Sequence, residues 1–218
     1  MKLLYQTHSP YARKVLVAAH EMGLRSQLEV IHHETSPTRR NDTVFALNPL
    51  GKVPVLVTDD LVLFDSSVIC EYLDGLAPHA GLIPARGTAR LRALTNQALA
   101  QGIADAGIAA RWETDRRPEH LRWPAMRDGQ LAKIAVSCDL LERQLAADPA
   151  AAGTLAAVGH GTRIPDIGAV AVATALGWIE FRNVYPFRVD RPRLASWYDL
   201  FNSRASMRAT TLSGDTHD

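Results

Sequence analysis

Two short segments near the start of this 218-residue chain carry groups that could bind a small peptide. Residues 48–56 (NPLGKVPVL) place Pro54 directly before an apolar run, and proline belongs at the start or edge of a strand because it cannot donate a ladder hydrogen bond. A cis Val53–Pro54 bond would expose the backbone amide and carbonyl of Val53 at that edge. Asp65 and Ser66 follow and could present a carboxylate and a hydroxyl to the amino-acid end of a peptide. The pattern predicts a receptor for a small peptide.

Ser9 is a third candidate because it directly precedes Pro10 at the expected start of a helix. Serine at the N-cap followed by proline is a strong helix-start signal, and capping is the stronger interpretation of this serine taken alone. A helix N-terminus that also carries a hydroxyl can stabilise an anion and lower the pKa of a thiol, which is about 8.5 when free. Ser9 is therefore a candidate for thiol activation as well as for capping.

The elements that would position these groups alternate between strand and helix over the first 80 residues. The pattern predicts strands at residues 3–5 and 28–32, a helix from Pro10 that ends near Gly23, and a polar loop with room for one helical turn at 33–47. Residues 55–57 and 61–64 flank a short polar turn, which is typical of a β-hairpin, and a helix follows from residues 65–67 to about 73. The order is βαβ and then ββα.

The rest of the chain is expected to be helical. A segment with Pro and Gly at residues 77–84 is typical of a linker, and strand signals vanish beyond it. Helices are predicted over residues 88–114, around 131–145, over 165–182 and over 193–201, with a loop at 147–161 and a polar, mobile tail from Leu212. We therefore divide the chain into an α/β domain at residues 1–78 and an all-helical domain at 86–218.

Composition excludes several classes of function. A formal net charge of +1 gives no basic footprint for nucleic acid, no apolar run approaches the roughly 18 residues of a membrane span, and the first residues turn polar too soon for a secretory signal. Cys70 and Cys138 fall on apolar helical faces without metal-ligand spacing, so we expect no metal site and two buried, inert thiols. These features fit a protein of the reducing cytoplasm that binds neither nucleic acid nor membrane.

The three motifs together resemble one family. Residues 7–14 (THSPYARK), 48–56 (NPLGKVPVL) and 65–73 (DSSVICEYL) have the types and spacing of the cytosolic glutathione S-transferases, especially bacterial members. The resemblance implies an α/β thioredoxin-like N-terminal domain, an all-α C-terminal domain and glutathione as co-substrate. The resemblance thus implies that the small peptide is glutathione, which the residues alone do not identify.

The resemblance also implies roles for individual residues. Ser9 would donate a hydrogen bond to the glutathione sulfur, with Thr7 as the substitute. Binding of the peptide is implied for five residues: Lys52, Val53, Pro54, Asp65 and Ser66. Arg39 and Arg40 are further candidates for the glycyl carboxylate, and His8 could line the sulfur site.

The implied activity is glutathione transfer, a detoxification reaction in which the thiolate attacks an electrophilic, mostly apolar small molecule in a homodimer. Because Ser9 stands where some relatives carry cysteine, thiol–disulfide exchange is disfavoured. Two alternatives remain, a glutathione-binding or interaction module with little transferase activity and an isomerase or peroxidase that uses the same thiolate. Relatives build the second-substrate pocket from the region of residues 103–117. A solvated helix face is the stronger interpretation of the side chains there: Arg111, Trp112, Glu113 and Arg116.

Overall fold

A four-stranded mixed sheet organises the first 80 residues. The computed structural model describes residues 1–147, 155 and 164–215, so the loop predicted at residues 147–161 lies almost entirely outside the described residues. The strands are β1 (Lys2–Tyr5), β2 (Glu29–His32), β3 (Val55–Val57) and β4 (Val62–Leu63). They lie in the order β2-β1-β3-β4, with β1 parallel to β2 and antiparallel to β3, and with β4 antiparallel to β3. The βαβ–ββα order is confirmed.

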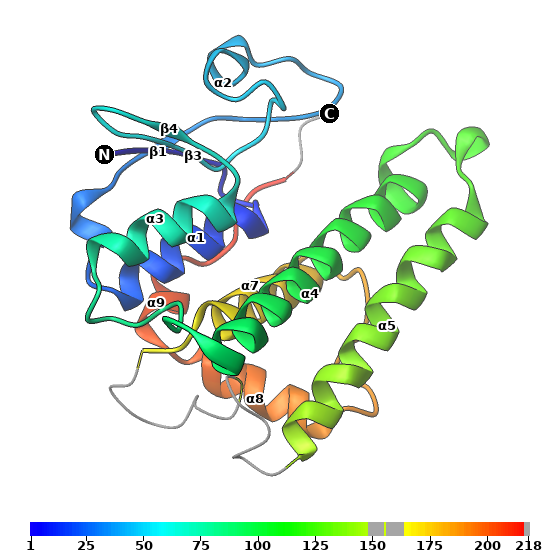
Figure 1. Cartoon of the computed structure of the whole chain (residues 1–218). Coiled ribbons are helices and arrows are strands. Elements are labelled where there is room, and N and C mark those ends of the chain that lie inside the picture. Colours follow the sequence, from blue (N-terminus) through cyan, green and yellow to red (C-terminus); the bar gives the residue numbers. More distant parts are fainter. Residues whose placement is uncertain (148–154, 156–163, 216–218) are drawn as a thin grey trace.

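Different helices cover the two faces of this sheet (Figure 1). The helices of the domain are α1 (Pro10–Glu21), α2 (Asp42–Leu47) and α3 (Ser66–Leu76). Because side chains alternate across a strand, the register assigns each residue to one face. Leu3 lies opposite Leu56, and both join the main core with α1 and α3. Leu4 lies opposite Val55, and these two pack with Val44 of α2.

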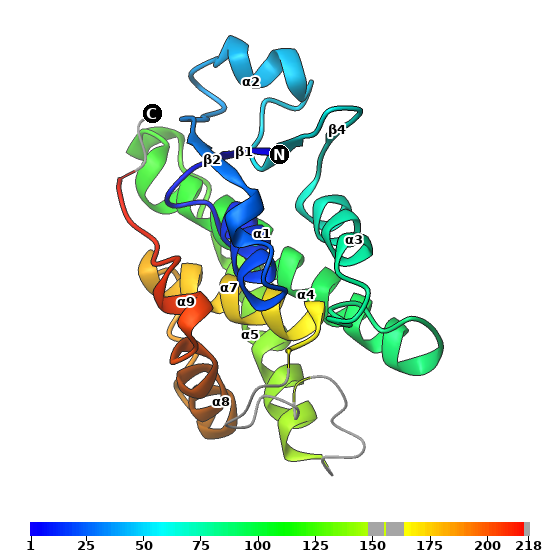
Figure 2. The ribbon, with the colours of Figure 1, turned by 90° about the vertical axis from the view of Figure 1, so that its left-hand side faces the viewer.

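The second half of the chain forms a helical domain. It contains α4 (Gly87–Arg111), α5 (Pro124–Ala146), α7 (Ile167–Phe181), α8 (Pro192–Asn202) and α9 (Ala205–Arg208), with a 3-10 turn at Glu119–Leu121. A further 3-10 turn, Arg25–Gln27, lies in the first domain between α1 and β2. A π-helical turn, Trp112–Arg116, directly follows α4. The apolar helix α7 is buried from Ile167 to Ile179 and packs against α4 and, across the domain boundary, against α1 (Figure 2). Its central place confirms the prediction from its nearly uncharged sequence.

Polar contacts fix the two domains to each other. Arg204, just before α9, pairs with Glu21 at the end of α1, with 2.7 Å between Nη2 and Oε2, and the Ser206 hydroxyl donates to the same carboxylate. The indole of Trp178 on α7 donates to the backbone carbonyl of His8 at 3.0 Å. The second contact joins the helical domain to the loop that precedes α1.

The start of the C-terminal segment is packed against the protein, so the prediction of a mobile tail does not hold for Leu212, where that tail was expected to begin. Leu212 is buried, and the Ser213 amide donates to the Thr7 carbonyl at 3.3 Å. The polar composition that suggested mobility cannot reveal a backbone contact with a loop some 200 residues earlier, since only the fold brings the two together.

Neither cysteine has an accessible thiol with a lowered pKa, which a reactive cysteine requires. Cys70 and Cys138 are free and buried, and burial raises the pKa of their thiols to about 11 and about 12. The prediction of buried, inert cysteines is confirmed. Within the described ranges, no helix is long and apolar enough to cross a membrane, and no group of three or more His, Cys, Asp or Glu side chains could hold a metal ion.

Candidate functional site

A cavity of about 750 Å³ lies between the two domains, within the size range of small-molecule sites. One wall comes from the first domain and carries polar groups and exposed backbone. The other comes from α4, the π-helical turn and α7, and offers apolar surface: Ile108, Ala109, Trp112 and Trp178. The same wall also carries Asp105, Arg111 and Arg116, so a molecule in the cavity would touch both apolar and charged groups on that side.

Ser9 lies in the wall of this cavity at the start of α1. Its Oγ accepts a hydrogen bond from the Ala12 amide at 3.2 Å, so the predicted N-cap is confirmed. Its own amide donates to the Gln6 carbonyl at 3.0 Å, which holds the backbone in place. Because Oγ acts as acceptor in the cap, the hydroxyl hydrogen can be donated to an anion in the cavity. Capping and anion stabilisation are compatible in one side chain.

Thr7 is placed differently from Ser9. It is absent from the described residues that line the cavity, and a Cβ added to Gly214 would lie 3.2 Å from its Oγ1. Its hydroxyl therefore faces the C-terminal segment, and the geometry favours Ser9 over Thr7 as the donor to a sulfur. The neighbouring His8 is buried and does line the cavity.

The segment before β3 presents backbone to the cavity. The Val53–Pro54 bond is cis, as the sequence motif predicts. The amide and carbonyl of Val53 make no hydrogen bond within the described part of the chain, although Val53 lines the cavity. Asn48 orders this loop, since its side chain donates to the Lys52 carbonyl at 2.8 Å and accepts from the Leu50 amide at 3.0 Å. Lys52 lines the cavity and is exposed, whereas Pro54 is buried behind it.

Asp65 and Ser66 lie at the N-terminus of α3, beside the cavity rather than in its described lining. The Asp65 carboxylate accepts from the Ser67 amide at 2.9 Å and from Gln101 at 3.2 Å. Burial alone would raise the pKa of Asp65, but these hydrogen bonds and the nearby charge of Lys14 hold it below its usual value. The Ser66 Oγ is buried and has no hydrogen-bond partner among the described residues. Such an atom is a ready contact for a ligand.

Tyr11 connects this corner to the cavity. Its hydroxyl donates to Asp105 of α4, and both residues line the cavity. Burial, the hydrogen bond to Asp105 and the charges of Asp105 and Asp65 all raise the pKa of Tyr11. Two carboxylates therefore lie near one tyrosine. They form an acidic corner that already contains the buried ammonium group of Lys14, whose charge interacts with both Asp65 and Asp105. The sequence analysis missed Tyr11 and Asp105, because only the fold brings α1 and α4 together.

The prediction of a solvated helix face for Arg111, Trp112, Glu113 and Arg116 is wrong. Arg111, Trp112 and Arg116 line the cavity. Glu113 is buried, accepts from the Trp123 amide at 2.8 Å and pairs with Arg117 at 2.8 Å. The helical period changes at the π-helical turn that directly follows α4, and this break is not visible in the pattern of residue types.

Arg39 and Arg40 also differ in position. Arg40 lines the cavity, its Nε is 2.6 Å from Asp42 Oδ1, and its guanidinium lies 4.0 Å from the centre of the Phe45 ring. Arg39 is exposed and is not in the cavity wall as described. Of the two arginines, Arg40 is the one placed to meet a ligand.

Comparison with known proteins identifies the family. Residues 8–76 match the family described as "Glutathione S-transferase, N-terminal domain". The chain is 34% identical over 212 residues to the Uncharacterized GST-like protein YibF of Escherichia coli K12, an alignment that covers 96% of this chain and 98% of YibF. The chain belongs to the glutathione S-transferase family. The thioredoxin-like N-terminal domain and the helical C-terminal domain that the sequence predicted agree with this membership.

The chain is also similar to two further proteins. A glutathione transferase family member from Pseudomonas fluorescens Pf-5, solved with bound glutathione, superposes with a TM-score of 0.86 at 37% identity and covers 98% of this chain and 99% of that one. The same protein is solved with bound S-(propanoic acid)-glutathione, with a TM-score of 0.82, 37% identity and 98% and 100% coverage. The Stringent starvation protein A homolog of Pasteurella multocida is 40% identical over 85 residues, which cover 37% of this chain and 38% of that protein.

Proposed function

We propose that this protein is a glutathione transferase that binds glutathione in the cavity between its domains and activates the thiol for attack on an electrophile. The observation that carries the proposal is the position of Ser9, a capping serine whose hydroxyl lies in the cavity wall at the N-terminus of α1. The glutathione held by the Pseudomonas relative supports the choice of peptide.

The groups around the cavity fit the parts of glutathione. The amide and carbonyl of Val53, which have no partner in the described part of the chain, can pair with the cysteinyl unit, as an added strand pairs with a sheet edge. The acidic corner near Tyr11 and Asp65 suits the γ-glutamyl ammonium group, and the unpartnered Ser66 hydroxyl suits its carboxylate. Lys52 lies beside Val53 and can meet the glycyl carboxylate. These pairings leave the sulfur to Ser9.

The proposed reaction requires the protein to favour the thiolate form of glutathione and to hold the two reactants together. A free thiol has a pKa of about 8.5, so a hydroxyl donor and a helix N-terminus that favour the thiolate raise the fraction of nucleophile near neutral pH. The thiol proton leaves to solvent, and the sulfur electron pair forms the new carbon–sulfur bond. The bond from that carbon to the leaving group breaks with its electron pair, which gives a thioether and the leaving-group anion. The cavity contributes by holding the two reactants together.

The apolar wall supplies the place for the second reactant. Ile108, Ala109 and Trp112 line the cavity across from the first domain. The S-substituted glutathione bound by the Pseudomonas relative is the kind of molecule that such a transfer would produce, and it supports a site that accepts a group on the sulfur. A mostly apolar electrophile is therefore the proposed second substrate.

An interaction module of the same fold is the second candidate function, because the Stringent starvation protein A homolog, whose name states no transferase activity, is similar to part of the chain. A conjugation assay separates the two. The protein is mixed with glutathione and either chlorodinitrobenzene or a panel of alkyl halides, and thioether is measured by mass spectrometry. We expect thioether to form faster than in protein-free solution with at least one electrophile, and more slowly with Ser9→Ala. Glutathione binding without acceleration for any electrophile would favour the interaction module. An isomerase or peroxidase activity would appear with the matching substrates in the same panel.

We also infer a homodimer in solution. Large apolar side chains are exposed on the first domain and on α4: Leu61, Val62, Val68 and Leu91. Burying such groups against a second copy would be favourable. Sedimentation velocity should give a dimer, and a monomer at micromolar concentration would contradict this inference.

A further inference from the structure

Lys14 is a buried charged group that the proposed chemistry does not use. It lies on α1, only 4% of the residue is exposed, and it is absent from the described lining of the cavity. Helices α1 and α3 pack side by side, and the Lys14 ammonium donates a hydrogen bond to the Ser67 hydroxyl in the first turn of α3 at 3.3 Å (Figure 1). The described residues give this ammonium no other hydrogen bond and no ion pair. A lysine is rarely buried unless it is paired, so its place beside α3 calls for a reason.

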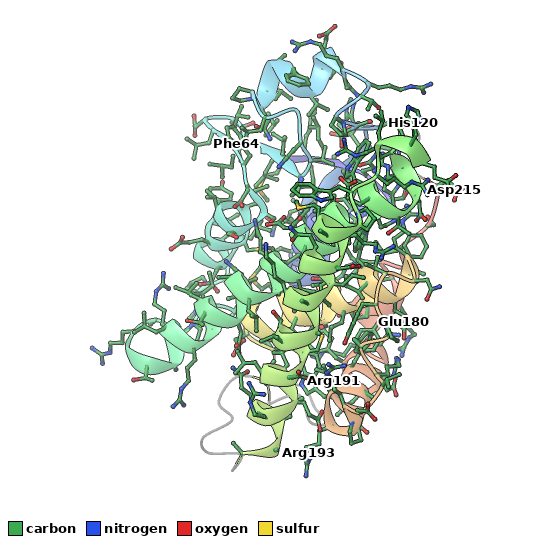
Figure 3. All side chains as sticks on the ribbon, turned by 90° about the vertical axis from the view of Figure 1, so that its right-hand side faces the viewer. Phe64, His120, Glu180, Arg191, Arg193 and Asp215 are labelled. Carbon is green, nitrogen blue, oxygen red and sulfur yellow. The ribbon has the colours of Figure 1, made fainter. Side chains whose placement is uncertain are left out.

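Ser67 joins Lys14 to Asp65. The Ser67 amide donates to Asp65 Oδ1 at 2.9 Å, while its hydroxyl accepts from Lys14. The other carboxylate oxygen of Asp65 accepts from Gln101 of α4 at 3.2 Å. In Figure 3 Phe64, which directly precedes Asp65, marks the segment that leads into α3. The start of α3 therefore carries an exposed negative group and, two hydrogen bonds away, a buried positive group.

The charges around the start of α3 suit both ends of an amino acid. Burial lowers the pKa of Lys14, and the charges of Cys70, Asp65 and Asp105 act in the opposite direction. The acidic corner contains two carboxylates and one ammonium, so negative charge remains for an ammonium group of a ligand. The N-terminus of α3 and the Lys14 ammonium favour an anion beside it. The buried Ser66 hydroxyl has no partner among the described residues and can donate to that anion.

We propose that Lys14 is a positioning residue that makes the start of α3 selective for a zwitterionic α-amino acid head over a simple amine or a simple carboxylate. Asp65 would bind the ammonium of the γ-glutamyl unit, and Ser66 with the α3 amides would bind its carboxylate. Lys14 does not touch the ligand but balances the charge of that carboxylate, held in place by Ser67. This inference rests on the proposed transferase function and assigns a specificity to its glutathione site.

Two other roles compete for Lys14. In a purely structural role the side chain would only fill the space between α1 and α3. In the other role its charge would only keep Asp65 ionised, because the pKa of that carboxyl is held below its usual value partly by the charge of Lys14. The three roles predict different effects on ligands that lack one end of the amino acid head.

Titration calorimetry at pH 7 with three thiol peptides separates these roles without requiring turnover. The peptides are glutathione, 4-aminobutyryl-cysteinylglycine, which lacks only the α-carboxylate, and glutaryl-cysteinylglycine, which lacks only the amino group. We expect the wild type to bind each analogue about tenfold or more weakly than glutathione, as lost charged hydrogen bonds imply. Lys14→Met should lose most of the preference for glutathione over the aminobutyryl peptide and keep the preference over the glutaryl peptide. Lys133→Met, the same substitution at an exposed lysine of α5 outside the described lining, is the matched control and should keep both preferences.

The possible outcomes distinguish the three roles. Equal weakening of all three peptides by Lys14→Met would overturn the inference in favour of the structural role. Loss of the preference over the glutaryl peptide instead would overturn it in favour of the role that acts on Asp65 alone. A preference over the aminobutyryl peptide that is absent in the wild type, or unchanged in Lys14→Met, would also overturn it and leave the proposed transferase function intact. Binding of none of the three peptides by the wild type would overturn both proposals.

The variant is expected to fold, because replacement of a buried charge by an apolar side chain of similar length is often tolerated. Circular dichroism checks this. If Lys14→Met does not fold, Ser67→Ala replaces it, since that change removes the hydroxyl that holds the ammonium. Ser67→Ala should also lose most of the preference over the aminobutyryl peptide, and an unchanged preference would overturn the inference.

Discussion

Removing the Ser9 hydroxyl should raise the pKa of the glutathione thiol bound to the protein. The hydroxyl can donate one hydrogen bond to the sulfur while its oxygen caps α1. A hydrogen bond to a charged group contributes about 1.5–3 kcal/mol, and one pKa unit corresponds to about 1.36 kcal/mol. Ser9→Ala should therefore raise the pKa of the bound thiol by about one to two. At a pH below the pKa of the bound thiol in both the wild type and the variant, the conjugation rate of the variant should be roughly tenfold to hundredfold lower. The assay is a pH titration of the thiolate absorbance in the complex.

The loss of helix capping must be distinguished from the loss of the hydrogen bond to the sulfur, because Ser9→Ala also lowers the stability of the protein by about 1 kcal/mol when the N-cap is removed. Ser9→Gly removes the same hydroxyl but costs only a few tenths of a kcal/mol as a cap. Both variants should raise the thiol pKa equally, and Ser9→Ala should have the lower melting temperature. Thr7→Ala is the matched control, since that hydroxyl faces Gly214 rather than the cavity. An unchanged thiol pKa in both Ser9 variants, or a shift with Thr7→Ala instead, would refute the reasoning.

Three further predictions concern binding and stability. Ser66→Ala should weaken glutathione binding about tenfold or more in calorimetry without lowering the melting temperature, since its hydroxyl has no partner in the described protein; a lower melting temperature with unchanged affinity would contradict this. Glu21→Gln should destabilise the protein by about 3 kcal/mol at pH 7, because it breaks the buried pair with Arg204. Although burial raises the pKa of Glu21, its hydrogen bonds hold that pKa below its ordinary value, so its contribution to stability is present above about pH 4.3 and is lost as the pH falls through the lower folded value. The difference in melting temperature from wild type should thus shrink in acid, and a difference independent of pH would exclude the ion pair as its cause. Gly51→Ala should lower the melting temperature, because φ is +63° there and a Cβ would meet the Phe45 ring; an unchanged melting curve would show that the loop can relax.

The first domain was largely predictable from the sequence because local signals and the fold agree there. Ser9 before Pro10 marks the start of α1, and Asp65 marks the start of α3, since each caps the first turn in the structure. Pro54 marks the edge where the backbone of Val53 makes no hydrogen bond to any other described residue. These signals lie within a few residues of the atoms that they position.

The second wall of the cavity was not predictable in the same way. The sequence favoured a solvated face for Arg111 and Arg116, because charged residues near a helix end are usually solvated. In the structure both line the cavity. The pairing of Tyr11 with Asp105 spans 94 residues and depends on how α1 meets α4. Ser213 makes a backbone contact with Thr7 that the composition of the tail does not encode. Each of these features depends on tertiary packing rather than on local pattern.

The central claim is that the cavity between the domains is a glutathione site, and calorimetric titration of the wild-type protein with glutathione tests it most directly. We expect saturable binding with one glutathione per chain at submillimolar concentration, weakened by Ser66→Ala. The absence of any binding heat or competition at millimolar glutathione would contradict the claim.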